Sequence, residues 1–189
     1  NEESLVGRGV SYCSTCDAPL YKDKIAIVVG GGNAAVEGAI LLSKYASKVH
    51  LIYRGSSLFR PEKILLTQLE KCKNLELHLE SEVKEIKEGN GGVEGVVINK
   101  KGQILDINSE GLFIEIGADP RLEIPNQLGL DIDKETNEVS VNKLMETSVE
   151  GIFAAGDLTN ASGPLKQTVT AAGQGAIAAL SAYTFLGSK

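Results

Sequence analysis

Residues 25–35 read Ile-Ala-Ile-Val-Val-Gly-Gly-Gly-Asn-Ala-Ala, a short apolar run followed at once by three glycines. The apolar run has the length of a buried parallel strand. The apolar residues after the glycines have helical spacing, at Val36, Ile40, Leu41 and Tyr45. A strand, a glycine turn and a helix in this order form the context that a dinucleotide-binding fingerprint requires. The stretch therefore predicts a Rossmann-like α/β fold.

Each small residue of this stretch has a predicted role in binding the nucleotide. Gly30 permits the tight turn, Gly32 lets the backbone approach a pyrophosphate, and Ala35 keeps the helix close to the strand. The helix is expected to start near Asn33, so the unpaired N–H groups at Asn33 and Ala34 would hold the phosphates.

A cysteine pair, Cys13 and Cys16, stands just ahead of this unit and is followed by Asp17. In such a pair one sulfur attacks a disulfide and the other resolves the mixed disulfide, while a neighbouring carboxylic acid can carry the proton. A C-x-x-C alone can be half of a zinc site, and a glycine motif alone can arise by chance. Together they predict electron transfer from a nucleotide to a disulfide.

The choice of nucleotide is indicated at the end of the second predicted strand, residues 49–53. An NAD site places a carboxylate there for the ribose 2′-hydroxyl. This chain has Tyr53 and Arg54 instead, with Arg60 nearby and no acid before Glu62. Guanidinium groups match the oxygens of a 2′-phosphate, so the sequence favours NADPH. The alternative is that both arginines only solvate a surface loop.

Composition limits the possible functions. The chain has 189 residues, 42% of them hydrophobic, which suits one or two domains. A net charge of −6 without any basic run argues against nucleic-acid binding. No apolar stretch approaches the roughly 18 residues of a membrane span, and the amino-terminal residues do not resemble a signal peptide. Three cysteines fit a reducing cytoplasm, where a C-x-x-C can cycle.

The remaining pattern predicts the order of the elements. A helix over residues 61–71, opened by Pro61, precedes strands at 75–79, 83–86, 93–98 and 112–117. The glycine cluster at 89–92 and the Lys101-Gly102 reversal make a β-meander inserted before the last parallel strand. A linker is expected at 118–120, followed by a short strand at 151–157 and an Ala-rich helix from Gln167 to Leu186.

The motifs together resemble those of the low-molecular-weight thioredoxin reductases of bacterial and archaeal type. The resemblance is carried by residues 9–17, 30–37, 59–65 and 151–157, with Lys166 and Gln167, in the family's order. It implies a flavoenzyme, usually a homodimer, that passes electrons from NADPH to FAD, then to the cysteine pair, and finally to thioredoxin. Cys16 would meet the flavin, Cys13 would attack the substrate disulfide, and Asp17 would give and take the proton.

The resemblance also implies a flavin site in the later part of the chain. Asp157 would bond the ribityl chain, and the segment with Lys166 and Gln167 would reach the isoalloxazine ring. The family begins with an FAD-binding half that has its own glycine fingerprint, and the first 24 residues here supply none. Residues 1–117 are therefore expected to form the NADPH-binding domain with the redox pair, and 118–189 the carboxy-terminal segment of the FAD-binding domain.

Two other functions stay open. One is another flavoprotein reductase of the same fold, such as a peroxiredoxin reductase subunit or a ferredoxin-type reductase, although the latter lacks the cysteine pair. The other is a nucleotide-binding module that is silent until it meets a separate FAD-binding chain. No metal site is expected, because His50 and His78 lie in strand-like runs as packed or solvated side chains and Cys72 adds no zinc-ligand spacing.

Overall fold

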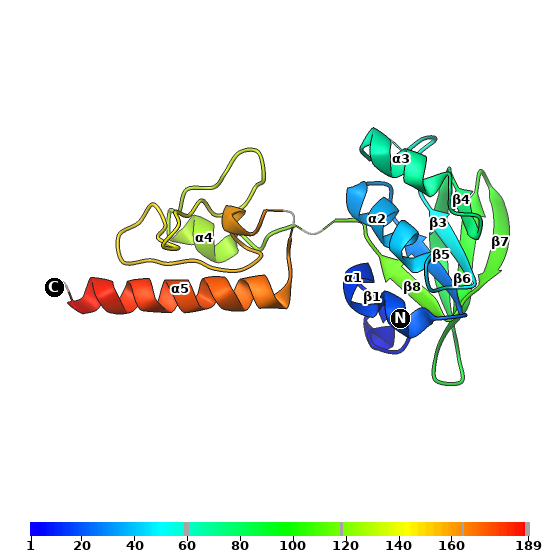
Figure 1. Ribbon diagram of the computed structural model, residues 1–189, viewed down its shortest axis with the longest axis horizontal. Helices are drawn as coiled ribbons and strands as arrows, with labels where there is room; N and C mark the ends of the chain where they lie inside the picture. Colours follow the sequence, from blue (N-terminus) through cyan, green and yellow to red (C-terminus); the bar gives the residue numbers. More distant parts are fainter. Residues whose placement is uncertain (59–60, 118, 164, 188–189) are drawn as a thin grey trace. The chain divides into compact units, whose positions relative to one another are not determined.

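The computed structural model describes residues 1–58, 61–117, 119–163 and 165–187. The chain divides into two compact units, unit 1 (Asn1–Gly117) and unit 2 (Ala118–Lys189). Figure 1 shows both β-sheets in unit 1 and the longest helix in unit 2. The glycine fingerprint and the cysteine pair belong to unit 1, and Asp157 belongs to unit 2.

Unit 1 is built on a five-stranded parallel sheet with the strand order β1-β8-β2-β3-β4. The strands β2, β3 and β4 were predicted to within one residue at each end, as 25–29, 49–53 and 75–79, whereas the two-residue strand β1 was missed. The predicted α/β Rossmann-like fold is confirmed. The strands are β1 (Val10–Ser11), β2 (Ile25–Val29), β3 (Lys48–Ile52), β4 (Leu75–His78) and β8 (Gly111–Ile114).

The two faces of this sheet are covered by different elements, as Figure 1 shows. Helix α2 (Asn33–Leu42) contributes Val36 to one apolar cluster, which also holds Val28 of β2. Ile27 points to the opposite face and packs in a second cluster with residues of the antiparallel sheet. A buried aliphatic side chain contributes roughly 1.5–3 kcal/mol, so this alternation fixes the register of β2 firmly.

The inserted meander is confirmed as a three-stranded antiparallel sheet. It consists of β5 (Ser81–Gly89), β6 (Gly92–Lys100) and β7 (Gln103–Asn108). Val96 and Ile98 of β6 are fully buried in the second cluster. The meander therefore covers the face of the parallel sheet that α2 leaves open.

Two helix boundaries differ from the prediction. Helix α3 (Lys63–Leu69) does not include Pro61, because the N-cap residue Glu62 has an extended ψ of 146° and the helix starts only after it. Helix α2 ends at Leu42, so Tyr45 lies in the following turn.

Unit 2 holds the short helix α4 (Glu123–Gln127), the 3-10 turn η3 (Asn160–Ser162) and helix α5 (Thr168–Gly187). The predicted helix is confirmed, one residue later than expected. The predicted strand at 151–157 is wrong: within it only Phe153 forms a β-bridge, to Glu146. The backbone hydrogen bonds of this segment go to the loop before it, such as that from Ala154 N to Met145 O. Among the described residues, the bridge at Phe153 stays isolated and is not extended into a strand.

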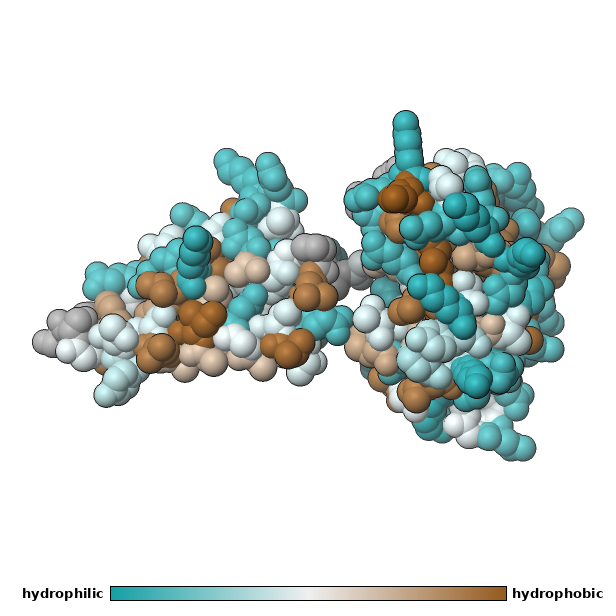
Figure 2. All heavy atoms as spheres, in the orientation of Figure 1, coloured by the Kyte–Doolittle hydropathy of each residue, from teal (hydrophilic) through white to brown (hydrophobic). Residues whose placement is uncertain are grey.

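Helix α5 is long and apolar enough to cross a membrane by length and composition, with a mean hydropathy of 1.2. None of its residues, all of them described, is buried, and Figure 2 shows apolar atoms along it. No apolar stretch of this length was expected from the sequence, but α5 reaches it although glycine, glutamine, serine and threonine interrupt its apolar residues. One such helix is weak evidence for a membrane span, so the absence of a membrane partner stays a prediction.

Candidate functional site

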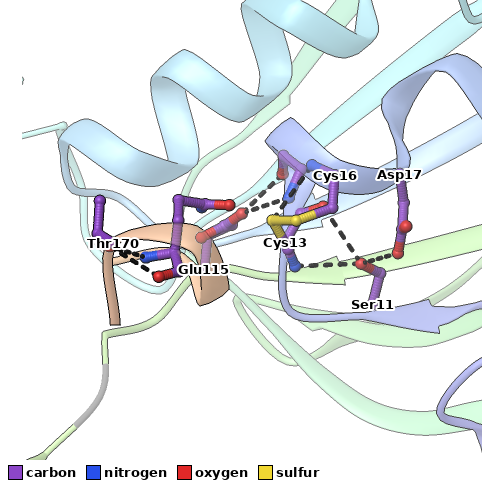
Figure 3. Close-up of a disulfide and its surroundings, with 8 residues drawn as sticks. Ser11, Cys13, Cys16, Asp17, Glu115 and Thr170 are labelled. Atoms are coloured by element: carbon purple, nitrogen blue, oxygen red, sulfur yellow. Dashed lines mark hydrogen bonds between the residues drawn. A yellow bond between two sulfur atoms is a disulfide. The ribbon is translucent and has the colours of Figure 1, made fainter. Parts of the chain in front are cut away.

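The redox turn is helix α1 (Ser14–Asp17), preceded by Cys13 as its N-cap residue. Cys13 and Cys16 form a disulfide with their Cα atoms 5.3 Å apart (Figure 3). The Cys13 sulfur accepts a hydrogen bond from the Cys16 backbone N–H at 3.1 Å. Cys16 is exposed and Cys13 half-buried, so an incoming group can reach the pair.

Ser11 at the end of β1 holds Asp17 beside the turn. The Ser11 hydroxyl is buried, donates to Asp17 Oδ2 at 2.7 Å and accepts from the Cys13 backbone N–H at 3.1 Å. The carboxylate that was predicted to carry the proton therefore has a fixed position relative to the cysteines, as Figure 3 shows. Sequence reasoning missed Ser11. Its place two residues before Cys13, at the end of a short extended segment, was the only available signal.

Glu115, directly after β8, anchors the redox turn from the other side. Its Oε1 accepts from the Ser14 backbone N–H at 3.1 Å and from the Ser14 hydroxyl at 2.7 Å (Figure 3). A Cβ at Gly38 of α2 would lie 2.5 Å from the Ser14 hydroxyl oxygen, so only glycine lets the turn lie this close to α2. The turn is thus attached both to the parallel sheet and to the helix of the nucleotide fingerprint.

A cavity of about 1030 Å³ opens at the carboxyl ends of β2, β3 and β8, where ligands bind in open α/β sheets. It brings together the predicted residues Gly30, Gly32, Asn33, Ala34 and Arg54. Residues that were not predicted to contact the nucleotide also line it: Gly31, Ser81, Glu82, Val83, Glu115, Ile116 and Gly117.

The three glycines of the turn are needed for different reasons. Gly30 has a positive φ of 150°, and a Cβ there would lie 2.3 Å from the Glu115 carbonyl oxygen. A Cβ at Gly31 would lie 2.4 Å from the Tyr53 ring, a contact that the sequence did not indicate. At Gly32 a Cβ would have nothing within 4 Å, so this position leaves space for a ligand. Ala35 is fully buried beneath the turn.

Arg54 is exposed and lines the same cavity, and so does Glu82 of β5. The pKa of Glu82 is lowered, first by its hydrogen bond from Lys84 and more weakly by the charge of Arg54. A carboxylate near the predicted phosphate-reading arginine was not anticipated. Arg60, the second predicted arginine, lies outside the described residues.

In unit 2, Asp157 is exposed, whereas Lys166 is held by protein groups. The Lys166 ammonium contacts the buried Glu138 carboxylate and donates to the Asp157 backbone oxygen at 3.2 Å. Lys166, which was predicted to contact a cofactor, therefore braces the Asp157 loop.

Two neighbouring contacts complete this loop. The Gly156 N–H donates to Gln174 Oε1 at 2.7 Å, which fastens the loop to α5. Gln167 is half-buried, and its N–H donates to the Thr170 hydroxyl at 3.2 Å. Neither Glu138 nor Gln174 had a sequence signal, because each partner is distant along the chain.

Comparison with known proteins agrees with this geometry. The family model for pyridine nucleotide-disulphide oxidoreductases matches residues 1–175. A thioredoxin reductase of Bacillus subtilis is 41% identical over 187 residues, which cover 98% of this chain and 58% of that protein.

Solved structures are similar as well, among them two thioredoxin reductases. The crystal structure of thioredoxin reductase from Streptococcus pyogenes has a TM-score of 0.86 and 37% identity, covering 99% of this chain and 60% of that one. A ferredoxin-flavin thioredoxin reductase from Clostridium acetobutylicum has a TM-score of 0.52 and 33% identity, covering 100% of this chain and 57% of that one. The chain thus spans about three fifths of the length of the relatives it matches. The resemblance to thioredoxin reductases is confirmed, and the chain belongs to the pyridine nucleotide-disulphide oxidoreductase family.

Proposed function

We propose that this chain carries the NADPH-binding and disulfide-bearing parts of a thioredoxin-reductase-type oxidoreductase. Electrons pass from NADPH through FAD to the Cys13–Cys16 disulfide, and from the dithiol to a thioredoxin-like protein disulfide. The observation that carries the proposal is Glu115, which lines the nucleotide cavity and also holds Ser14 of the redox turn. Likeness to thioredoxin reductases supports the choice of substrate.

NADPH is proposed to bind in the cavity at the ends of β2 and β3. The open space at Gly32 fits a pyrophosphate, and the N–H groups of Asn33 and Ala34 at the start of α2 would hold its oxygens. Arg54, with Arg60, would bind the 2′-phosphate. Residues 1–117 are accordingly the NADPH-binding domain.

FAD is proposed to contact residues 118–189, the later segment of its domain. The exposed Asp157 carboxylate fits the ribityl hydroxyls, and Gln167 would reach the ring. These residues hold only part of so large a cofactor, so the chain by itself should lose FAD in gel filtration. Stoichiometric flavin retained by the 189-residue chain would contradict this division.

The chain's own residues then carry the disulfide chemistry. The bound cofactors supply the two electrons that open the Cys13–Cys16 bond, which takes up two protons. The Cys13 thiolate, favoured by the N–H it accepts at the start of α1, attacks one sulfur of the substrate disulfide and releases the other as a thiol. Cys16 then attacks the Cys13 sulfur, restoring the internal disulfide and releasing the second substrate thiol. Asp17 is placed to give and take the proton.

The setting proposed for this activity is the cytoplasm, where the cysteine pair can cycle and Cys72 stays a free thiol. The complete enzyme is proposed to be a homodimer that acts on protein disulfides, without nucleic-acid or membrane partners.

Trapping the mixed disulfide tests the catalytic pair without any cofactor. The Cys16→Ser chain, reduced chemically and mixed with oxidised thioredoxin, should form a stable adduct through Cys13, because the resolving thiol is gone. The matched Cys13→Ser chain should form none. Mass spectrometry reads both. An adduct in Cys13→Ser alone would reverse the two roles, and no adduct in either would remove the pair from the mechanism.

The nucleotide preference is tested at Arg54. Arg54→Ala should weaken NADPH binding on the order of tenfold to a hundredfold and hardly change NADH binding, because a charge-assisted hydrogen bond contributes roughly 1.5–3 kcal/mol. Arg121→Ala, a surface arginine of unit 2, is the control. Equal losses for both nucleotides would show that Arg54 does not read the 2′-phosphate.

A second candidate function is favoured by helix α5, which has no buried residue and exposes large apolar side chains such as Val169, Leu180 and Leu186. The chain would then be a nucleotide-binding module that is inactive until it joins a separate FAD-binding chain. A colourless preparation that binds NADPH, and becomes active only on addition of that second chain, would favour this alternative.

A further inference from the structure

The only two histidines of the chain lie side by side on neighbouring strands. His50 is in β3 and His78 in β4, the edge strand of the parallel sheet, with Glu76 two residues before His78. In the parallel register His50 pairs with Glu76 and Ile52 with His78, so all three side chains project from the same face. Both imidazoles are buried, while Glu76 reaches the surface.

Their ligand atoms converge. His50 Nδ1 lies 2.9 Å from His78 Nε2, and the Glu76 carboxylate oxygens lie 3.8 Å from His50 Nδ1 and 3.5 Å from His78 Nε2. Ligand atoms of a tetrahedral zinc site lie about 2.0–2.2 Å from the ion, hence roughly 3.3–3.6 Å from one another. The three observed separations bracket that range.

The groups also have the protonation that a metal requires. Burial lowers the pKa of His50 to about 4 and is the main reason that the pKa of His78 is lowered as well. Both rings are therefore neutral near pH 7, and one donates its N–H to the other. The pKa of Glu76 is lowered, chiefly by the hydrogen bond from Lys48, so it is ionised. Metal binding needs only a shift of the ring proton to the other nitrogen of the donating imidazole, with no net proton released.

The geometry points to a binding site for one zinc-class divalent transition ion, with His50 Nδ1, His78 Nε2 and the Glu76 carboxylate as protein ligands. Two imidazoles and a carboxylate suit such ions, and the exposed side of Glu76 leaves the fourth position to water. The ion would tie the edge strand β4 to β3. Sequence reasoning missed the site because it looked for cysteine spacings and did not place Glu76 with the histidines.

One cation competes for the site. Lys48 Nζ lies 2.7 Å from Glu76 Oε2, and its charge, with that of Lys100, also acts on His78. The Lys48–Glu76 pair is half-exposed, where an ion pair holds weakly. A divalent ion with two imidazole ligands should therefore displace the ammonium group from Glu76, at some loss of affinity.

The direct test uses the full 189-residue chain without a histidine tag, with the Cys13–Cys16 disulfide intact and Cys72→Ser to remove the free thiol. Zinc chloride is added while the imidazole nitrogens are followed by NMR. Because the chain has two histidines, assignment is simple. Both rings should shift together and saturate at one equivalent. Rings that do not respond would overturn the proposal, and this result depends on no substitution in the site.

Calorimetric zinc titrations of matched variants identify the third ligand and the competitor. Glu76→Gln should weaken binding at least tenfold, and Lys48→Met should strengthen it about threefold to tenfold. The Lys84–Glu82 pair on β5 is an equivalent exposed ion pair without histidines. Glu82→Gln and Lys84→Met should therefore leave the zinc affinity unchanged. Unchanged affinity in Glu76→Gln would reduce the site to two histidines and contradict the proposed ligand set.

Discussion

The two units of the chain differ strongly in how much apolar surface they bury. Unit 1 places helices on one face of its parallel sheet and an antiparallel sheet on the other, and both described apolar clusters lie within it. Unit 2 has isolated β-bridges, loops braced by single polar contacts such as Lys166 with Glu138, and a 20-residue helix without a buried residue. Unit 1 therefore has the means to be stable by itself, whereas unit 2 depends on additional contacts for comparable stability.

The largest expected effect concerns local stability. Backbone amides of α5 should exchange with solvent on the order of a thousandfold faster than those of β2 and β3, because opening α5 exposes little additional apolar surface. Hydrogen exchange followed by mass spectrometry of peptic fragments measures this. Equal protection of α5 and the two strands would contradict the proposed difference between the units and show that α5 is covered in solution. Dependence of that protection on protein concentration would identify a second copy as the cover.

Next in size is the effect of a single methyl group in the glycine turn of unit 1. Gly30→Ala should destabilise unit 1 by roughly 2–4 kcal/mol, because the new Cβ meets the Glu115 carbonyl oxygen and the backbone has a positive φ. Gly32→Ala, where the Cβ meets open space, should change stability by less than about 0.5 kcal/mol yet weaken NADPH binding. Urea unfolding measures the loss of stability, and nucleotide titration measures the loss of NADPH binding. Equal stability losses would contradict the open space at Gly32, and unchanged NADPH binding in Gly32→Ala would refute the assignment of Gly32 to the ligand.

The buried histidines predict a pH dependence confined to unit 1. The pKa of His50 is lowered to about 4 in the folded chain, and that of His78 is also lowered. Below about pH 6.5 the unfolded chain, whose histidines have their ordinary pKa, therefore binds more protons than the folded chain. Stability should therefore be fully present above about pH 6.5 and fall towards pH 4, by on the order of 2 kcal/mol.

Urea midpoints at several pH values in the presence of EDTA would show this slope. A double variant, His50→Gln with His78→Gln, serves as the reference, since it keeps every carboxylate. The same slope in the double variant would assign the pH dependence to other groups.

The smallest effect is expected in the redox turn. Glu115→Gln keeps an oxygen acceptor for Ser14 but removes a negative charge near Cys13. Loss of this charge favours the thiolate form of Cys13. Alkylation of Cys13 in the reduced Cys72→Ser chain should become about two- to threefold faster near pH 7. Glu94→Gln, an exposed acid of β6, is the control. A slower reaction would indicate that loss of order in the turn outweighs the change in charge.

The sequence was most informative where structure depends on neighbouring residues. The run from Ile25 to Val29 and the glycines after it define β2, the turn and the start of α2 without reference to the rest of the chain. Ser14 and Glu115 are 101 residues apart, and no local pattern signals that they meet.

The wrong strand at 151–157 has a related cause. Its apolar residues suit a strand, but a strand also needs a neighbour to pair with, and composition does not supply that information. Likewise Arg54 was predicted to contact the nucleotide from its position after β3. Glu82 was not, because only the fold of the meander places it beside the same cavity.

Glu115 would couple the proposed nucleotide binding to the redox state of the cysteine pair. The same residue lines the cavity proposed for NADPH and accepts two hydrogen bonds from the turn that carries the cysteines. If nucleotide binding alters the free energy of those bonds, thermodynamic linkage requires that reduction of the disulfide alter nucleotide affinity by the same factor. The reduction potential of the cysteine pair would then depend on nucleotide concentration, so this chain would respond to the supply of reduced nucleotide as well as transmit its electrons.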